Sequence, residues 1–88
     1  MDYKGLEKTV RGFANHNRIQ ILELLYRRPN LSLIEISGIL KLNFKTAGSH
    51  MNRLVNSNIV EKENDGMYVR HKLTSKGKSI LLFLRTTE

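Results

Sequence analysis

Two short helices with a very short connection, followed directly by a hairpin, constrain this fold more than any other feature. Ser32 and Glu35 have the spacing of a capping box, which predicts a helix over 33–41. A second helix is predicted over about 44–57, so only about three residues separate the two. Alternating apolar residues over 59–73, interrupted by a turn signal, then predict two antiparallel strands.

Further helices are predicted on both sides of this segment. Apolar residues recurring at i, i+4 and i+7 predict a short helix over 4–14. A second helical stripe runs to about residue 28, where Pro29 ends it. A last helix is predicted over 75–86. The candidate N-cap residues are Asn15 or Asn17, Ser32, Asn43 and Thr74.

This order of elements is the outline of a winged helix-turn-helix. The predicted fold class is mostly α with a small β-hairpin (α+β), with four helices before the hairpin and one after it. With 88 residues the chain has enough length for one modest core. We therefore expect a single domain over 1–88, with the helix-turn-helix at about 33–57 and the hairpin, or wing, at about 59–73.

The second helix of the pair is predicted to have one apolar and one polar side. At about 100° per residue, the apolar side contains Phe44, Ala47, Met51, Leu54 and Val55. The polar side contains Lys45, Thr46, Ser49, Asn52, Arg53 and Asn56, with His50 at the border. Cations and short hydrogen-bonding side chains suit a DNA major groove. A plain solvated face is the alternative, but such faces usually mix acids with lysines, and residues 41–60 contain no acid.

The charge balance points to a polyanionic partner. Lys and Arg number 15 against 8 Asp and Glu, a formal net charge of +7. The second half is the more basic one, because residues 41–88 contain 9 basic and 4 acidic residues. Affinity for a nucleic acid would then fall steeply with salt.

The wing offers two more candidates for a phosphate contact. If Asp65-Gly66 is a two-residue loop, Glu61 faces Arg70 across the hairpin. Arg70 then has two possible roles, a phosphate contact or a purely structural ion pair. Lys72 is the second candidate phosphate contact.

Other classes of function find little support. The chain has no cysteine, no glycine-rich phosphate loop and no paired carboxylates in a plausible cleft, so we expect no enzyme and no cofactor. His16, His50 and His71 fall on different predicted elements, and we expect no metal site. No apolar run approaches the length of a membrane span, and the N-terminus lacks a signal sequence. The expected location is the cytoplasm or nucleoid of a prokaryote.

The last predicted helix indicates a second copy of the chain. Residues 80–84 are five consecutive apolar residues, which span the whole circumference of a helix. One side can pack on the domain, and the other needs cover. A homodimer is therefore expected, with burial on both sides within the monomer as the alternative. The predicted interface residues are Leu6, Val10, Phe13, Ile80, Leu81, Phe83 and Leu84.

The segment from Leu31 to Val60 resembles the helix-turn-helix of the ArsR-type winged-helix regulators. Residues 13–22 are similar to that family's upstream motif, and 73–77 also resemble MarR-type proteins. The chain departs from the pattern at His16 and Gly48, and residues 33–36 lack the Cys-x-Cys of metal-sensing members. The resemblance implies DNA binding, dimerisation through the terminal helices and DNA contacts by Lys45, Thr46, Ser49, His50, Arg53, Arg70 and Lys72.

The sequence therefore predicts a homodimeric regulator that binds double-stranded DNA. The full set of expected DNA contacts is Arg18, Lys45, Thr46, Ser49, His50, Asn52, Arg53, Arg70 and Lys72. His50 can instead be a packed border residue. Two alternatives stay open: a sequence-indifferent architectural DNA-binding protein, and a protein-interaction module on the same fold.

Overall fold

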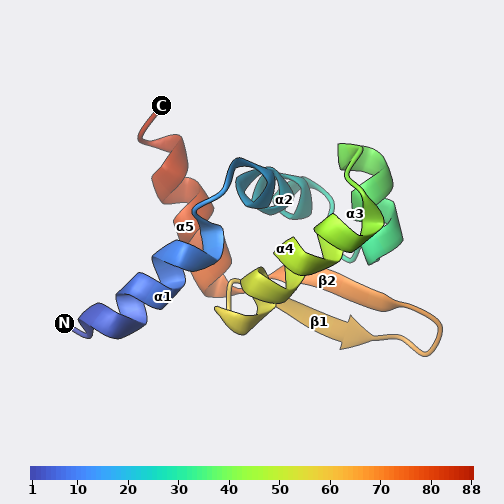
Figure 1. Cartoon of the computed structure of the whole chain (residues 1–88), viewed down its shortest axis with the longest axis horizontal. Helices are drawn as coiled ribbons and strands as arrows, with labels where there is room; N and C mark the ends of the chain where they lie inside the picture. Colours follow the sequence, from blue (N-terminus) through green and yellow to red (C-terminus); the bar gives the residue numbers. More distant parts are fainter.

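The computed structural model describes residues 1–88 and shows a winged helix (Figure 1). The elements in chain order are α1 (Tyr3–Phe13), α2 (His16–Arg27), α3 (Leu33–Leu40), α4 (Phe44–Asn56), β1 (Val60–Asn64), β2 (Val69–Leu73) and α5 (Ser75–Arg85). Five helices and one antiparallel hairpin confirm the predicted fold class and element order.

Helix capping follows the local sequence. The Asn15 side chain accepts hydrogen bonds from the backbone N–H groups of Asn17 and Arg18. Ser32 and Glu35 form the reciprocal capping box. Caps at Asn43 and Thr74 start α4 and α5 as predicted. The cap of α1 was not predicted: the Asp2 carboxylate accepts a hydrogen bond from the N–H of Gly5.

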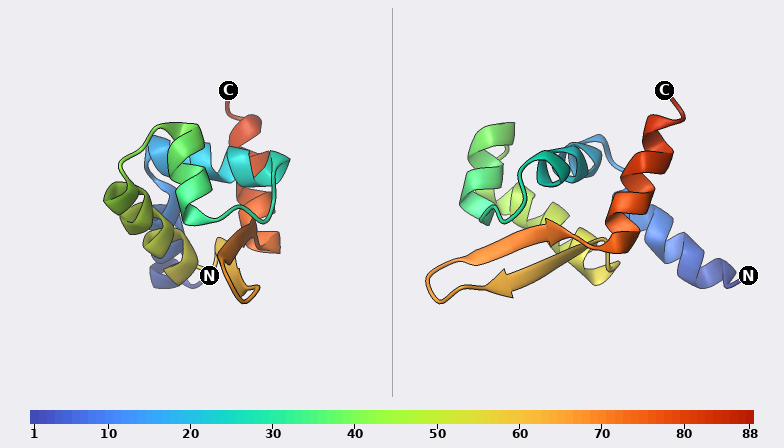
Figure 2. Two further views of the ribbon diagram at one scale, coloured as in Figure 1. Left: turned by 90° about the vertical axis from the view of Figure 1, so that its right-hand side faces the viewer. Right: turned by 180° about the vertical axis from the view of Figure 1, so that it is seen from behind.

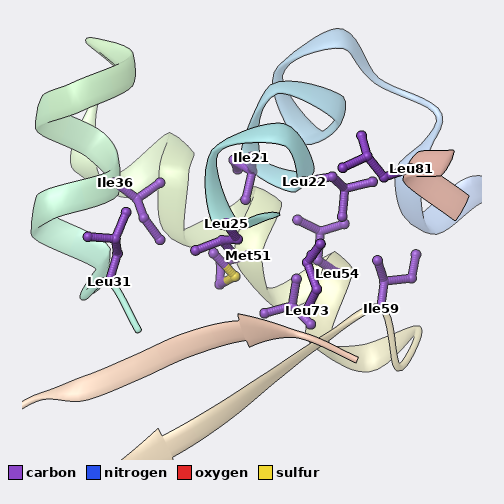
Figure 3. Close-up of a cluster of buried hydrophobic side chains, with 11 residues drawn as sticks. Ile21, Leu22, Leu25, Leu31, Ile36, Met51, Leu54, Ile59, Leu73 and Leu81 are labelled. Carbon is purple, nitrogen blue, oxygen red and sulfur yellow. The ribbon is translucent and has the colours of Figure 1, made fainter. Parts of the chain in front are cut away.

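The core lies between α2, α4 and the inner end of the hairpin. Its side chains come from all elements except α1 and from Leu31 and Ile59 in the connecting segments, and they point toward one another (Figure 3). The members are Ile21, Leu22, Leu25, Leu31, Ile36, Met51, Leu54, Ile59, Val60, Leu73 and Leu81. This cluster fixes α4 with one side inward and the other outward.

The hairpin register differs from the prediction. The loop residues are Gly66 and Met67, because the Asp65 N–H bonds to the Tyr68 carbonyl at 3.1 Å. Of these two loop residues, only Gly66 has a positive φ, +99°, as the first loop residue of a type II′ turn requires. Glu61 therefore pairs with Lys72, and the predicted Glu61–Arg70 pair is wrong.

Only the inner end of the hairpin is buried against the domain, and its outer end is exposed. β2 begins at Val69, two residues later than predicted, and only its inner residues His71 and Leu73 are buried. An isolated bridge from Leu31 to His71 adds a short third edge, with the His71 N–H donating to the Leu31 carbonyl at 2.9 Å. The wing is thus joined directly to the chain segment that enters α3.

Two glycines set the positions of the terminal helices. A Cβ atom at Gly12 would lie 2.6 Å from the Ser57 Cβ, so α1 approaches the end of α4 closely. A Cβ atom at Gly77 would overlap the Ile59 carbonyl oxygen, so α5 approaches the backbone after α4 equally closely. α1 is held at its C-terminal end, and its N-terminal end projects from the body (Figure 2).

Candidate nucleic-acid interface

The outward side of α4 is an uninterrupted polar surface. Ala47, Met51 and Leu54 are buried on the inner side, as the helical wheel predicts. The exposed polar residues of the helix are Lys45, Thr46, Ser49, Asn52, Arg53 and Asn56. Their side chains form no hydrogen bond or ion pair within the chain; only backbone groups of this set are bonded. We call these six residues the α4 face, and its donors and acceptors are free to bind a partner.

Phe44 is the exception to the wheel. It is 54 % exposed, although the pattern predicts that it lies on the buried side. Its helical angle is compatible with burial, but it is the first residue of α4, at the end of the helix. The exposed ring is therefore available beside the first turn of the α4 face.

Arg18 has contacts within the chain that the sequence analysis did not foresee. Its Nη1 donates to the carbonyl oxygens of Arg11 at 2.7 Å and Gly12 at 3.2 Å, and its Nε donates to His50 Nδ1 at 3.2 Å. The guanidinium thus connects the end of α1 with α2 and α4. It is not the free group expected for a phosphate contact, and only its Nη2 lacks a partner in the chain.

His50 lies at the edge of the α4 face and is half-buried. Burial, the positive charge of Arg18 and then that of His16 lower its pKa. The neutral ring accepts the Arg18 hydrogen bond at Nδ1, so its proton is on Nε2. His50 is therefore both a packed border residue and a hydrogen-bond donor next to the α4 face.

Arg70 is paired within the chain rather than a free cation. Its Nε bonds to Asp65 Oδ2 at 2.7 Å, and its Nη1 lies 3.4 Å from Glu35 Oε1 and 3.3 Å from the Asn30 carbonyl. The guanidinium also covers the Tyr68 ring at 5.2 Å. Because of the Asp65 hydrogen bond, the pKa of Arg70 is raised. These contacts hold the outer wing against the start of α3.

Lys72 is partly neutralised by its neighbours. Its Nζ lies 3.5 Å from Glu61 Oε1 and 3.9 Å from Glu63 Oε2. Both ion pairs are exposed and have little energy in water. A phosphate could therefore recruit Lys72 more easily than Arg70.

The apolar surface outside the core lies on α1 and α5. Leu6 and Val10 are 43 % and 51 % exposed, and Phe83 is 62 % exposed. Leu81, which the prediction assigned to a dimer interface, is instead a core residue at 2 % exposure. Leu82, the next residue, is 49 % exposed, so Leu82 rather than Leu81 lies on the exposed side of α5.

The remaining expected interface residues are only partly available. Phe13 and Ile80 are half-buried and pack against the core, and Leu84 is half-buried as well. Tyr3, which the sequence analysis did not select, is 77 % exposed on α1. It lies one helical turn before Leu6, so the helical spacing alone could have identified it.

The structure has neither a metal-binding cluster nor a membrane-spanning helix. No group of three or more His, Asp or Glu side chains lies close enough together to hold a metal ion. No helix has the length and apolar character that crossing a membrane requires.

Comparison with solved structures finds the same fold in transcriptional regulators. HlyU from Vibrio cholerae superposes with a TM-score of 0.83 at 23 % identity, covering 99 % of this chain and 97 % of that chain. PagR, a transcriptional repressor of Bacillus anthracis, gives 0.81 at 23 % identity, with coverage of 94 % and 99 %. A homodimeric winged helix-turn-helix DNA-binding domain from Mycobacterium bovis, part of a possible ArsR-family regulator, gives 0.82 at 21 %, with coverage of 96 % and 77 %.

Sequence comparison identifies the family. No curated protein sequence matches the chain. The family model described as winged helix-turn-helix DNA-binding matches residues 15–61, which include all of α2, α3 and α4. This is a family of binding domains rather than of enzymes, in agreement with the prediction. The chain therefore belongs to the winged helix-turn-helix DNA-binding family.

Proposed function

We propose that this protein is a homodimeric transcriptional regulator of the cytoplasm that binds specific sequences in double-stranded DNA. The observation that carries the proposal is the α4 face, which has two cations, no acid and no intramolecular partner for any of its six side chains. Helix-turn-helix proteins place the corresponding helix in the major groove.

Each part of the α4 face has a task in this arrangement. Lys45 and Arg53 supply positive charge for phosphates or guanine, and Thr46, Ser49 and Asn52 read base edges. At its border, His50 adds an Nε2–H donor. From the wing, Lys72 meets the backbone, whereas Arg70 keeps the wing in position.

The exposed apolar residues of α1 and α5 support the homodimer. Leu6, Val10 and Phe83 lie on terminal helices and outside the core. A second copy of the chain would cover them, and two-fold dimers are the commonest assembly. The Mycobacterium bovis domain of the same fold is described as homodimeric. In a two-fold dimer the two α4 helices would meet half-sites about 34–36 Å apart on a near-palindrome.

Selection of bound duplexes from a random pool, read at two salt concentrations, tests this function. We expect enrichment of a near-palindromic sequence and a loss of about 1–3 kcal/mol in binding for Arg53→Ala, the cost of one bidentate base contact. Lys78→Ala on α5 is the matched control, since it removes one exposed cation outside the α4 face.

Other results would support a different function. Equal affinity for random and selected duplexes would indicate a sequence-indifferent architectural protein. No retention on DNA at low salt would indicate a protein-interaction module. An unchanged isotherm for Arg53→Ala would exclude that residue from the site.

A further inference from the structure

α1 has three distinct sides, and only two of them have a role so far. Gly12 on one side contacts the body, next to Ser57. A second side has the exposed apolar residues Leu6 and Val10. The third side consists of cations at i, i+4 and i+7, spacings that bring side chains to one side of a helix. These are Lys4, Lys8 and Arg11, and we call them the α1 basic row.

The α1 basic row borders a groove of about 290 Å³ between α1 and the C-terminal end of α4. Arg53 and Asn56 form the opposite wall, and no hydrophobic residue lines the groove. Four cations therefore face one acid, Glu7, whose carboxylate is 3.2 Å from the Arg11 guanidinium.

Most of the positive charge of this groove is uncompensated. Lys4, Lys8 and Arg53 have no ion pair within the chain, whereas Arg11 has one, with Glu7. The charge of Arg53 also reaches Arg18, where it adds to burial in lowering the pKa of that guanidinium. A concave surface with converging cations and no apolar lining is suited to an anion.

The position of the groove identifies the anion. Arg53 and Asn56 belong both to this groove and to the α4 face, so the two surfaces are continuous. α1 and α4 pack together and lie on the same side of the molecule in both figures (Figures 1 and 2). A duplex bound to the α4 face would therefore bring its phosphates next to α1. From Lys4 to Arg11 the row extends about 10 Å along the helix at 1.5 Å per residue.

We propose that the groove between the α1 basic row and the end of α4 binds phosphates of the DNA backbone, beside the segment that α4 reads. This inference depends on the proposed DNA-binding function. Because α1 also has the apolar side assigned to the dimer, the two grooves of a dimer would lie toward its two-fold axis. The phosphates they bind are then those between the two half-sites.

The salt dependence of binding tests this proposal. The probe is a duplex selected from the random pool, and the variant is Lys4→Gln with Lys8→Gln, both exposed residues without intramolecular partners. Each lost phosphate contact lowers the slope of log K against log salt by about 0.9. The slope should become shallower by about 3.6 for a dimer. Between 50 and 200 mM salt the wild-type affinity should thus fall roughly 100-fold more than that of the variant.

A matched control separates the groove from general charge. Arg28→Gln with Lys78→Gln removes two exposed cations outside the groove and the α4 face and should leave the slope near that of the wild type. Glu7→Gln works in the opposite direction: it removes the only acid of the groove and releases Arg11, so affinity should rise. A purely structural role for α1 would not produce this change of sign.

A second measurement leaves the protein intact. Uncharged methylphosphonate linkages between the half-sites should weaken the wild type and have little effect on the Lys4→Gln, Lys8→Gln variant. If the wild type binds selected DNA as a dimer but this variant keeps its slope, the groove proposal is wrong and the proposed function stands. If the wild type binds no duplex at low salt, the proposed function itself fails.

Discussion

Arg18 either connects α1, α2 and α4 or contacts a DNA phosphate, and Arg18→Ala distinguishes these two roles. The guanidinium donates two hydrogen bonds to the carbonyls that end α1 and one to His50 on α4. A hydrogen bond contributes about 0.5–1.5 kcal/mol net. The Arg11 contact is exposed and counts at the low end. We therefore expect a loss of about 2 kcal/mol in the free energy of unfolding.

This loss is large for a small domain. At about 4–8 °C per kcal/mol for a domain of this size, Tm should fall by roughly 8–16 °C. Arg18→Lys keeps the charge but not the planar fork, so it should recover only part of the loss. Arg28→Ala is the control, because the Arg28 side chain is exposed and makes no hydrogen bond.

Two measurements distinguish these roles: thermal unfolding followed by circular dichroism, and the salt dependence of DNA binding. The account predicts a lower Tm and a nearly unchanged salt slope. If Arg18→Ala instead has the wild-type Tm and a slope shallower by about 0.9 per protomer, Arg18 is a phosphate contact and the connecting role is wrong.

Three further outcomes are expected. Gly77→Ala should lower the free energy of unfolding by about 1–3 kcal/mol in chemical denaturation, because its Cβ would overlap the Ile59 carbonyl. Gly38→Ala is the control and should be neutral or stabilising, because nothing lies within 4 Å of that position. Equal effects of the two substitutions would refute the packing argument. Burial lowers the pKa of His71 and His50, so the folded state binds fewer protons than the unfolded state. Stability should be highest above the ordinary histidine pKa of 6.5 and fall as the pH drops toward 5. The double variant His50→Gln, His71→Gln should have a flatter pH dependence. An equally steep profile in that variant would show that these histidines are not its cause. Val10→Glu with Phe83→Glu should give a monomer in sedimentation and weaken binding to a palindrome; a dimer that persists would place the interface elsewhere.

Features that depend on neighbouring residues could be predicted from the sequence. The caps at Asn15, Ser32 and Asn43 involve residues two or three positions apart, so their spacing is visible in the chain. The inner and outer sides of α4 follow from helical periodicity alone. For the same reason, the helix-turn-helix and the α4 face could be located before the structure was known.

Features that depend on contacts between residues far apart in the chain could not be predicted from the sequence. Arg18 and His50 are 32 residues apart, and Arg70 and Glu35 are 35 apart, so no local pattern reveals their contacts. The hairpin error has a different cause. Centring the loop on Asp65-Gly66 or on Gly66-Met67 gives the same alternation of sides, so burial cannot choose between the two registers.

The terminal helices show a third reason why the sequence alone was not sufficient: the direction of the core is not written in the chain. Periodicity finds the apolar run of α5, but only the direction of the core determines that Leu81 is buried and Leu82 is exposed. The spacing of Lys4, Lys8 and Arg11 was visible as well. Its significance depends on the packing of α1 beside the end of α4.

The central claim is that the α4 face meets the duplex, and an amide chemical-shift titration with a selected duplex tests it most directly, since the protein is only 10.2 kDa. The account predicts the largest shifts at Thr46, Ser49 and Asn52, with smaller ones at Lys8 and Lys72. Shifts on α2 and α5 alone, with α4 unchanged at saturating DNA, would contradict it.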